Sequence, residues 1–261
     1  MSRLLQFVKR YILKHPVYVA VYAKFFFEKK CVFNAYLYSK EEIQNQVTQG
    51  KSLIRLGDGE INLLLSLSNH YQTFSPLVQK MLQKIISQYN ENSPYVLAIP
   101  RFINVSNTEL KITKKFNVWL PLKVIFFLKF KKNVGYFDAH SFYYDNYFES
   151  TVGPLLLDKK VVLITKKTTI DFHMRNNNIP WKHLTFIEVP EIEAFNAYDD
   201  IKQKIETHIA QFVPTDTVLL FALGPVGKYL TYHFAFAGIQ SLDIGKVAEV
   251  MYNNVSLEYL I

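Results

Sequence analysis

Hydrophobic positions in the second half of the chain form short continuous runs that alternate with amphipathic stretches. Apolar runs of 4–8 residues bounded by turn residues are typical of buried strands, and apolar positions every three or four residues are typical of helices. The pattern predicts strands over residues 160–165, 184–189, 217–223 and 240–245. It predicts helices over residues 168–176, 198–212 and 225–237. This half is therefore expected to be a succession of strand–helix units.

The first half shows the same alternation. Strands are predicted over residues 53–56 and 95–100, and helices over residues 39–49, 61–67, 76–89 and 114–130. Ser39 and Ser75 can cap the helices that follow them, Gly50 can end the first one, and Pro121 is expected to interrupt the last. Strands alternating with helices indicate an α/β fold with a mostly parallel sheet and helices on both faces. In such sheets ligands bind beyond the carboxyl ends of the strands.

The first 30 residues form a basic segment in front of this pattern. On a helical wheel, apolar and aromatic positions between residues 4 and 12 share one face, and the basic residues lie on the other. Pro16 is expected to end or kink this helix. The apolar run over residues 17–27 is shorter than the roughly 20 residues that span a membrane, and no convincing signal-peptide cleavage site follows it. Two roles stay open for the helix: packing on the domain, or lying on an anionic membrane leaflet.

Composition predicts one packed domain over residues 31–261. The chain is 49% hydrophobic and contains only 9 glycines and 10 prolines in 261 residues, so a disordered protein is not expected. No glycine- or serine-rich linker divides it. The single Cys31 argues against a disulfide framework and favours a cytoplasmic location.

The net charge of +8 is unevenly distributed. Residues 1–30 carry seven Lys or Arg against one Glu, residues 111–132 carry seven Lys and no acid, and the remainder is acidic. Two basic segments on an acidic body favour an anionic surface as partner, such as the inner face of the plasma membrane. Nucleic acid is not the expected partner, because the sequence has no helix-turn-helix, zinc-finger or RNP-like pattern.

Two carboxylates follow the strand predicted over residues 53–56, in the sequence Gly57-Asp58-Gly59-Glu60. In an extended segment, residues i and i+2 project to the same side, so both carboxylates would face one point. Such a pair repels unless a cation or proton lies between its members, and oxygen ligands together with a diphosphate suit Mg²⁺ or Mn²⁺. The alternative is helix capping, with Asp58 as N-cap and Glu60 near the positive helix end.

A second glycine-containing stretch, FALGPVGKYL, follows the strand predicted over residues 217–223. Gly224 allows a tight turn, Pro225 suits the first helical position, and Gly227 allows a close approach to the first turn. The free N–H groups and partial positive charge of a helix start can bind a phosphate, to which Lys228 would add a charge. The stretch is neither a P-loop nor GxGxxG, and ordinary strand-to-helix turns also use glycine.

Two further side chains are candidates for the site. Arg101 follows the strand predicted over residues 95–100 and can pair with a phosphate, or it can be a surface or structural arginine. His140 lies in the aromatic sequence YFDAHSFYYD near Asp138. His140 is a candidate catalytic base, with a structural histidine as the alternative.

The motifs RLGDGE, EAFNAYDDI, LLFALGPVGKYLTYHFAFAG and IQSLDIG occur in the order seen in bacterial GT-D-type glycosyltransferases, which the chain resembles over roughly residues 50–250. The resemblance implies a Rossmann-like α/β domain that transfers a sugar from a nucleotide donor, typically UDP-glucose. The family's Asp-x-Glu pair is associated with Mn²⁺ and the donor diphosphate. The positions that match family motifs are Arg55, Asp58, Glu60, Gly224, Pro225 and Asp243.

The chain departs from the family pattern at two places. Lys246 stands where family members usually have a histidine, and Thr165, Lys166 and Lys167 replace a Glu-Gly and an arginine after the middle strand. The expected function is a metal-dependent nucleotide-sugar glycosyltransferase acting on a glycan or glycolipid acceptor in surface polysaccharide or glycoprotein synthesis. Because of these departures, a non-catalytic, membrane-associated partner in glycan assembly stays as the alternative.

Overall fold

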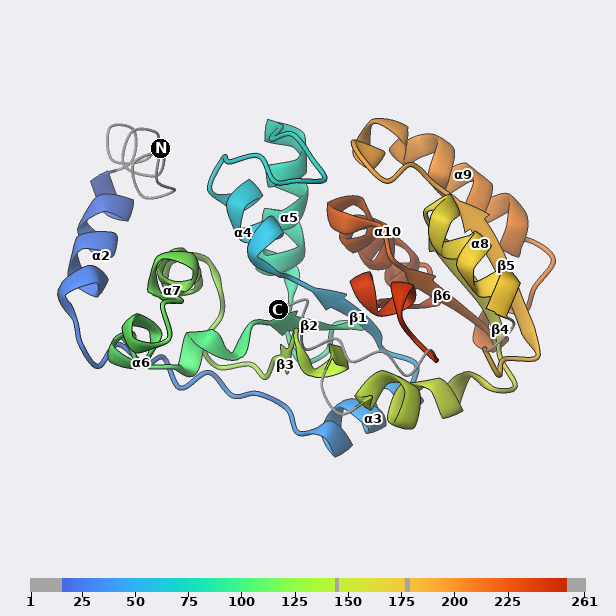
Figure 1. Ribbon diagram of the computed structural model, residues 1–261, viewed down its shortest axis with the longest axis horizontal. Coiled ribbons are helices and arrows are strands. Elements are labelled where there is room, and N and C mark those ends of the chain that lie inside the picture. Colours follow the sequence, from blue (N-terminus) through green and yellow to red (C-terminus); the bar gives the residue numbers. More distant parts are fainter. Residues whose placement is uncertain (1–15, 144–145, 177–178, 253–261) are drawn as a thin grey trace.

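The computed structural model describes residues 16–143, 146–176 and 179–252 (Figure 1). A seven-stranded sheet runs through the middle of the molecule, with the strand order β3-β2-β1-β7-β6-β4-β5. All its paired strands are parallel, which confirms the predicted class. The strands are β1 (Ser52–Arg55), β2 (Tyr95–Ile99), β3 (Phe137–Asp138), β4 (Lys160–Thr165), β5 (His183–Glu188), β6 (Thr217–Phe221) and β7 (Gln240–Asp243).

Six strands were expected from the apolar runs, each within a few residues of its observed bounds. The seventh, β3, was not predicted, because its two residues are too short to show a pattern. β3 pairs with β2 at the edge of the sheet. This pairing brings the segment that carries Asp138 and His140 to the edge where the other strands end.

Strands β1, β2, β4, β6 and β7 are buried on both faces, which explains why they appear as continuous apolar runs, whereas the edge strand β5 is only partly buried. Alternate residues of one strand belong to different cores: Leu53 packs with Ile43 on one face, and Ile54 packs with Ile85 on the other. The Leu53 face is covered by α3 (Lys40–Thr48) and by the short helical turns Phe148–Val152 and Gly153–Leu156. Helices lie on the opposite face: α4 (Asp58–Leu64), α5 (Pro76–Gln88), α9 (Tyr198–Ile209) and α10 (Gly224–Phe236).

Helix starts follow the predicted capping. Ser39 begins α3 with a reciprocal capping box to Glu42, and Ser75 accepts a hydrogen bond from the Val78 backbone N–H at the start of α5. Helix α8 (Lys167–Asn176) also lies where it was expected, and the His173 ring of α8 contacts the Ala248 carbonyl. The capping serines therefore set the residues at which α3 and α5 begin.

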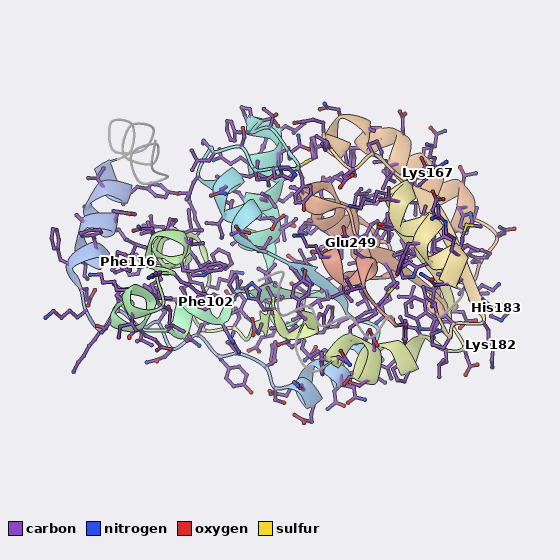
Figure 2. The ribbon with its side chains drawn as sticks, in the orientation of Figure 1. Phe102, Phe116, Lys167, Lys182, His183 and Glu249 are labelled. Atoms are coloured by element: carbon purple, nitrogen blue, oxygen red, sulfur yellow. The ribbon has the colours of Figure 1, made fainter. Side chains whose placement is uncertain are left out.

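The predicted interruption at Pro121 is wrong. Helix α7 (Phe116–Lys129) continues through Pro121, beginning two residues later than expected. Residues on several sides of α7 are buried in the large core, among them Trp119, Leu120 and Leu122. This packing holds the helix together although Pro121 has no backbone N–H to donate. α6 (Asn107–Ile112) precedes it, and Figure 2 shows Phe102 and Phe116 at this end of the molecule, opposite Lys182 and His183.

The basic N-terminal segment is described from residue 16 onward, so the amphipathic helix expected before Pro16 lies outside the described residues. Helix α2 (Pro16–Phe27) begins at Pro16, which suits the first turn of a helix. Tyr22 and Phe25 are buried, and the Phe25 ring lies edge-on to Phe127 of α7 with 5.3 Å between ring centroids. α2 thus packs on the domain. None of the helices described is long and apolar enough to cross a membrane.

Candidate active site

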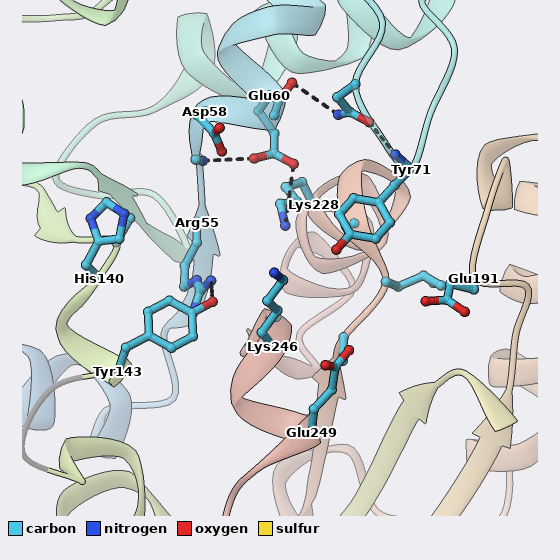
Figure 3. A pocket seen from close by; sticks show the side chains of 18 of the residues that line it. Arg55, Asp58, Glu60, Tyr71, His140, Tyr143, Glu191, Lys228, Lys246 and Glu249 are labelled. Atoms are coloured by element: carbon cyan, nitrogen blue, oxygen red, sulfur yellow. Dashed lines mark hydrogen bonds and ion pairs between the residues drawn. The ribbon is translucent and has the colours of Figure 1, made fainter. Parts of the chain in front are cut away.

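A cavity of about 440 Å³ lies at the carboxyl edge of the sheet (Figure 3). The segments that follow all seven strands contribute to its wall, as expected for the ligand site of a parallel α/β sheet. One residue after each strand, in the order β1 to β7, illustrates this convergence: Gly57, Phe102, His140, Lys166, Glu191, Gly224 and Lys246. The connections that leave the neighbouring strands β6 and β4 run in opposite directions across the sheet, from β6 toward β7 and from β4 toward β5.

The carboxylates after β1 belong to a helix. The expected extended geometry is wrong, because α4 begins at Asp58 and Gly57 is its N-cap residue. The Glu60 side chain accepts a 2.8 Å hydrogen bond from the Gly57 backbone N–H, which completes half of a capping box. Glu60 is buried while Asp58 is exposed, and both border the cavity. Capping thus involves Glu60, and Asp58 is the first helical residue and not the cap.

Below this helix start lies a buried charge network. The Lys228 ammonium is 2.9 Å from Asp243 Oδ2 and 3.7 Å from Glu60 Oε1. The Arg55 backbone N–H donates to Asp243 Oδ2 over 3.2 Å. Burial alone would lower the pKa of Lys228, but Asp243 and Glu60 outweigh it and raise that pKa above its ordinary value. This network holds the ends of β1 and β7 and the first turns of α4 and α10 together.

The Arg55 side chain extends from β1 under the loop after β7. Its guanidinium donates to the Ile244 carbonyl over 3.0 Å and to the Tyr143 hydroxyl over 2.6 Å, and it lies over the Tyr143 ring. Gly245 has φ +54°, and a Cβ at that position would lie 2.7 Å from Arg55. Glycine is therefore required at 245 both for its backbone conformation and for the close approach of Arg55.

The β6 end provides a helix start as predicted. α10 begins at Gly224, which has φ +54°, and Pro225 occupies its first turn. Gly227 does not face the cavity: a Cβ there would lie 3.3 Å from Leu223 and 3.4 Å from Phe221. It allows the helix to pack closely on its own strand. The cavity wall here is formed by Gly224, Leu223 and Lys228.

A clamp between two loops positions Tyr71 over this helix start. The Glu193 carboxylate accepts hydrogen bonds of 2.6–2.7 Å from the Thr73 backbone, the Thr73 hydroxyl and the Gln72 amide. Hydrogen bonds from Thr73 hold the pKa of Glu193 below its ordinary value. The Glu193 backbone N–H donates to the Tyr71 carbonyl, and a Cβ at Gly224 would lie 3.7 Å from the Tyr71 Cβ. Sequence reasoning missed this clamp, although Glu193 lies in one of the family motifs.

A third charged group closes the cavity on the side of β4 and β5. The Lys166 ammonium is 2.8 Å from Glu191 Oε1 and 3.0 Å from Glu249 Oε1. Lys166 was identified only as a departure from the family pattern, and the two glutamates were not identified. The rule that ligands bind at strand ends could have found Lys166 and Glu191, because each follows a strand directly or nearly so.

The aromatic wall carries His140. Its ring lies 5.8 Å from the rings of Phe102 and Trp119, and its Nδ1 is 3.6 Å from Asp138 Oδ1. This nitrogen is buried and has no hydrogen-bond partner among the described residues. Arg101 is exposed and does not belong to the cavity wall. The structure thus places His140, but not Arg101, in the cavity with Asp58 and Glu60.

The donor set can be compared with what a divalent cation needs. Asp58 is exposed, and its carboxylate has no hydrogen bond or ion pair within the described part of the chain. Glu60 has one oxygen on Gly57 N and the other 3.7 Å from Lys228. The described residues contain no group of three or more metal-ligating side chains. One or two carboxylates fit Mg²⁺ or Mn²⁺ when substrate phosphates and water supply the other ligands.

Three solved structures share this architecture, and they place the chain among proteins with a glycosyltransferase fold. A glycosyltransferase (DUF1792) from Streptococcus sanguinis is 21% identical, with a TM-score of 0.68 over 82% of each chain. A structure described as domain of unknown function 1792 with a distinct glycosyltransferase fold is 19% identical, with a TM-score of 0.70 over 88% of this chain and 83% of the other.

The model of the glycosyltransferase GT-D fold family matches residues 53–254, so the chain belongs to the GT-D family. A comparison with curated proteins found no match. The Rossmann-like GT-D architecture expected from the motifs is confirmed, and the fold supports an enzyme with glycosyltransferase activity.

Proposed function

We propose that this protein is a nucleotide-sugar glycosyltransferase that moves a hexose, such as glucose from UDP-glucose, to a glycan or glycolipid acceptor. The observation that carries the proposal is the meeting of Asp58 and the α10 start at one cavity. Asp58 offers an unengaged carboxylate, and the first turn of α10 offers backbone N–H groups. Family membership supports the reaction class.

In the proposed complex the donor diphosphate lies between the α4 and α10 starts. Asp58, with Glu60 behind it, would hold Mn²⁺ or Mg²⁺, which when bound supplies positive charge to the departing diphosphate. The N–H groups at the α10 start would donate to the phosphate oxygens. Lys228 joins the two helix starts from below, and Arg55 holds the loop after β7, so neither side chain needs to move for this.

Sugar transfer breaks the bond between the anomeric carbon and the diphosphate oxygen, which leaves with the electron pair. A new bond forms to the acceptor oxygen, whose proton must be taken up. We assign this role to His140, which borders the cavity with Nδ1 directed to Asp138. The proton would be taken up at Nε2, the resulting imidazolium is stabilised by the Asp138 carboxylate beside Nδ1, and the rings of Phe102 and Trp119 keep the imidazole in place.

The test compares two first-turn aspartates. Asp58→Asn keeps the shape of the α4 start but removes the charge, whereas Asp199→Asn makes the same change in the first turn of α9, outside the cavity wall. We expect Asp58→Asn to lower release of UDP from UDP-glucose with Mn²⁺ by about 100-fold, and Asp199→Asn to leave it unchanged. Equal activity of the two variants would exclude the proposed site.

A non-catalytic role is the second candidate. The observation that favours it is the Lys166–Glu191–Glu249 group, which occupies the cavity side where the family pattern differs. In that case UDP-sugars would bind, shown by calorimetry, but no UDP would be released with any acceptor. Turnover that depends on Asp58 would exclude this candidate.

We further propose that α2, α6 and α7 form a docking flank for the anionic inner face of the plasma membrane. Phe27 and Ile112 are 81% and 76% exposed. Lysines follow or precede them closely in the sequence, and two lysines of this region lie over aromatic rings, Lys111 over Phe116 and Lys132 over Phe127. A surface with both exposed apolar side chains and lysines suits a partner that combines negative headgroups and acyl chains. Docking there would bring the enzyme close to a lipid-linked acceptor.

A further inference from the structure

The cations of the cavity differ in how far they are already engaged. Arg55 donates to Ile244 and Tyr143, and Lys228 pairs with Asp243 and Glu60. These contacts are buried. Both side chains therefore have donors engaged inside the protein before any ligand arrives.

The two cationic side chains at the sides of the cavity, Lys166 and Lys115, are engaged as well. Lys166 pairs with Glu191 and Glu249, and the Lys115 ammonium lies 4.9 Å from the centre of the Phe102 ring. Lys246 is different. It borders the cavity, is exposed, and has no hydrogen bond, ion pair or aromatic partner among the residues that the structure describes.

The backbone before Lys246 is fixed. Gly245 has the left-handed conformation and contacts the Arg55 guanidinium, and the short helix Gly245–Glu249 begins there. Figure 3 shows the Lys246 side chain extending from this helix into the cavity, toward Lys228 and Tyr71. Lys246 is thus presented by a rigid base while its ammonium keeps its donors free.

Charge balance gives this free ammonium a role. Five cationic side chains and four carboxylates line the cavity, and the buried Asp243 behind the wall offsets the excess. A nucleoside diphosphate adds negative charge that this balanced cavity cannot absorb by itself. Asp58 can meet it only through a cation, and the N–H groups at the α10 start carry no net charge, so direct charge compensation requires a free cationic side chain.

We propose that Lys246 is a substrate-contacting residue whose ammonium binds the diphosphate of the donor, on the opposite side from Asp58. This inference rests on the proposed function and assigns a second anchor to the same site. Lys246 compensates charge on the leaving diphosphate, and it gives the donor an affinity that does not depend on a divalent ion. The lysine that departs from the family's usual histidine therefore carries part of the donor recognition.

Calorimetric titration with UDP and GDP tests this, each with Mn²⁺ and with EDTA. The variants are Lys246→Met, Lys246→Arg, and Lys167→Met as a control at an exposed lysine outside the cavity wall. We expect Lys246→Met to weaken nucleotide binding about 10-fold with Mn²⁺ and to abolish binding in EDTA. Lys246→Arg should recover most of the affinity, and Lys167→Met should match the wild type.

The outcomes separate this inference from the proposed function. Wild-type binding that Asp58→Asn weakens but Lys246→Met leaves intact under both conditions overturns the role of Lys246 alone. If the wild type binds neither UDP nor GDP, the proposed function fails and the inference fails with it. Thermal unfolding of Lys246→Met should equal that of the wild type, because an exposed side chain without partners adds little to the fold.

Discussion

Two buried lysines have different partners in two regions of the molecule: the cavity floor, formed by Arg55, Glu60, Lys228 and Asp243, and the flank formed by α2, α6 and α7. Lys228 on α10 pairs with carboxylates, and its pKa is raised because Asp243 and Glu60 outweigh the effect of burial. Lys123 on α7 is fully buried, and its partners among the described residues are the carbonyls of Cys31 and Val105. Burial lowers the pKa of Lys123. At the floor, carboxylates neutralise the charge of Lys228, whereas in the flank carbonyl oxygens solvate the charge of Lys123.

The difference has a structural purpose in each region. At the floor, opposite charges join helix starts and strand ends that lie far apart in the sequence, and so fix the geometry of the site. In the flank, the Lys123 ammonium ties α7 to two loop carbonyls and closes the packing of α2 and α6 on the domain. Removing each lysine should therefore have effects of different size and kind.

The largest effect is expected from Lys228→Met. It leaves Asp243 buried without a counter-charge, and breaking a buried ion pair in this way costs about 3–5 kcal/mol. Urea unfolding would measure the loss of unfolding free energy, and calorimetry would show weaker nucleotide binding. The double variant Lys228→Met/Asp243→Leu should recover much of the stability but not the binding. Full stability of the single variant would contradict the network.

A smaller loss is expected from Lys123→Met. It leaves two carbonyls without a donor, which costs about 1–3 kcal/mol, and it also removes a poorly solvated charge, which offsets part of that cost. Nucleotide binding should not change, because Lys123 is not part of the cavity wall. The matched control is Lys129→Met, an exposed lysine on the same helix. A loss as large as that of Lys228→Met would remove the contrast between the two regions.

The two lysines should also respond oppositely to pH. Because the pKa of folded Lys228 is raised, its stabilisation is complete below the ordinary value of 10.5 and is lost as the pH rises through the higher folded value. Because the pKa of folded Lys123 is lowered, its cost is complete below that lowered value and disappears as the pH rises toward 10.5. Unfolding free energies of wild type and each methionine variant between pH 8 and about 11 would reveal both trends.

The smallest effect is expected at the flank surface. Lys132→Gln should weaken binding to phosphatidylserine vesicles about fivefold, since each basic residue near such a surface contributes about 1 kcal/mol. Added salt should release the wild type. Deleting residues 1–30 is a poor test, because Tyr22 and Phe25 are part of the core. Equal binding of Lys132→Gln and the wild type at low salt would exclude this flank as the docking surface.

Local sequence was informative wherever one segment contains its own signal. Apolar runs predicted six of the strands, and for five of them the reason is that strands buried on both faces need apolar residues at nearly every position. Ser39 and Ser75 marked their helices because a cap acts within three residues. The segment after β1 was ambiguous for the same reason: Asp58 and Glu60 fit an extended turn and a helix start equally well, and the helix prevailed.

Contacts between distant segments could not be read in this way. The carboxylate of Glu193 holds Thr73 across 120 residues of sequence, and Lys166 meets Glu249 from another strand end. Nothing in the neighbourhood of either residue marks the partner. β3 was missed because its two residues pair with β2 only after the chain has folded.

The sequence by itself determined the fold class, the order of strands and helices, and the two strand-end motifs at 57–60 and 224–228, because each depends on residues close together in the chain. Only the tertiary structure decided which charged side chains form ion pairs with one another and which remain free to bind a ligand. That decision depends on burial and on distances between strand ends, so Glu60 and Lys228 became part of the floor while Asp58 and Lys246 face the cavity.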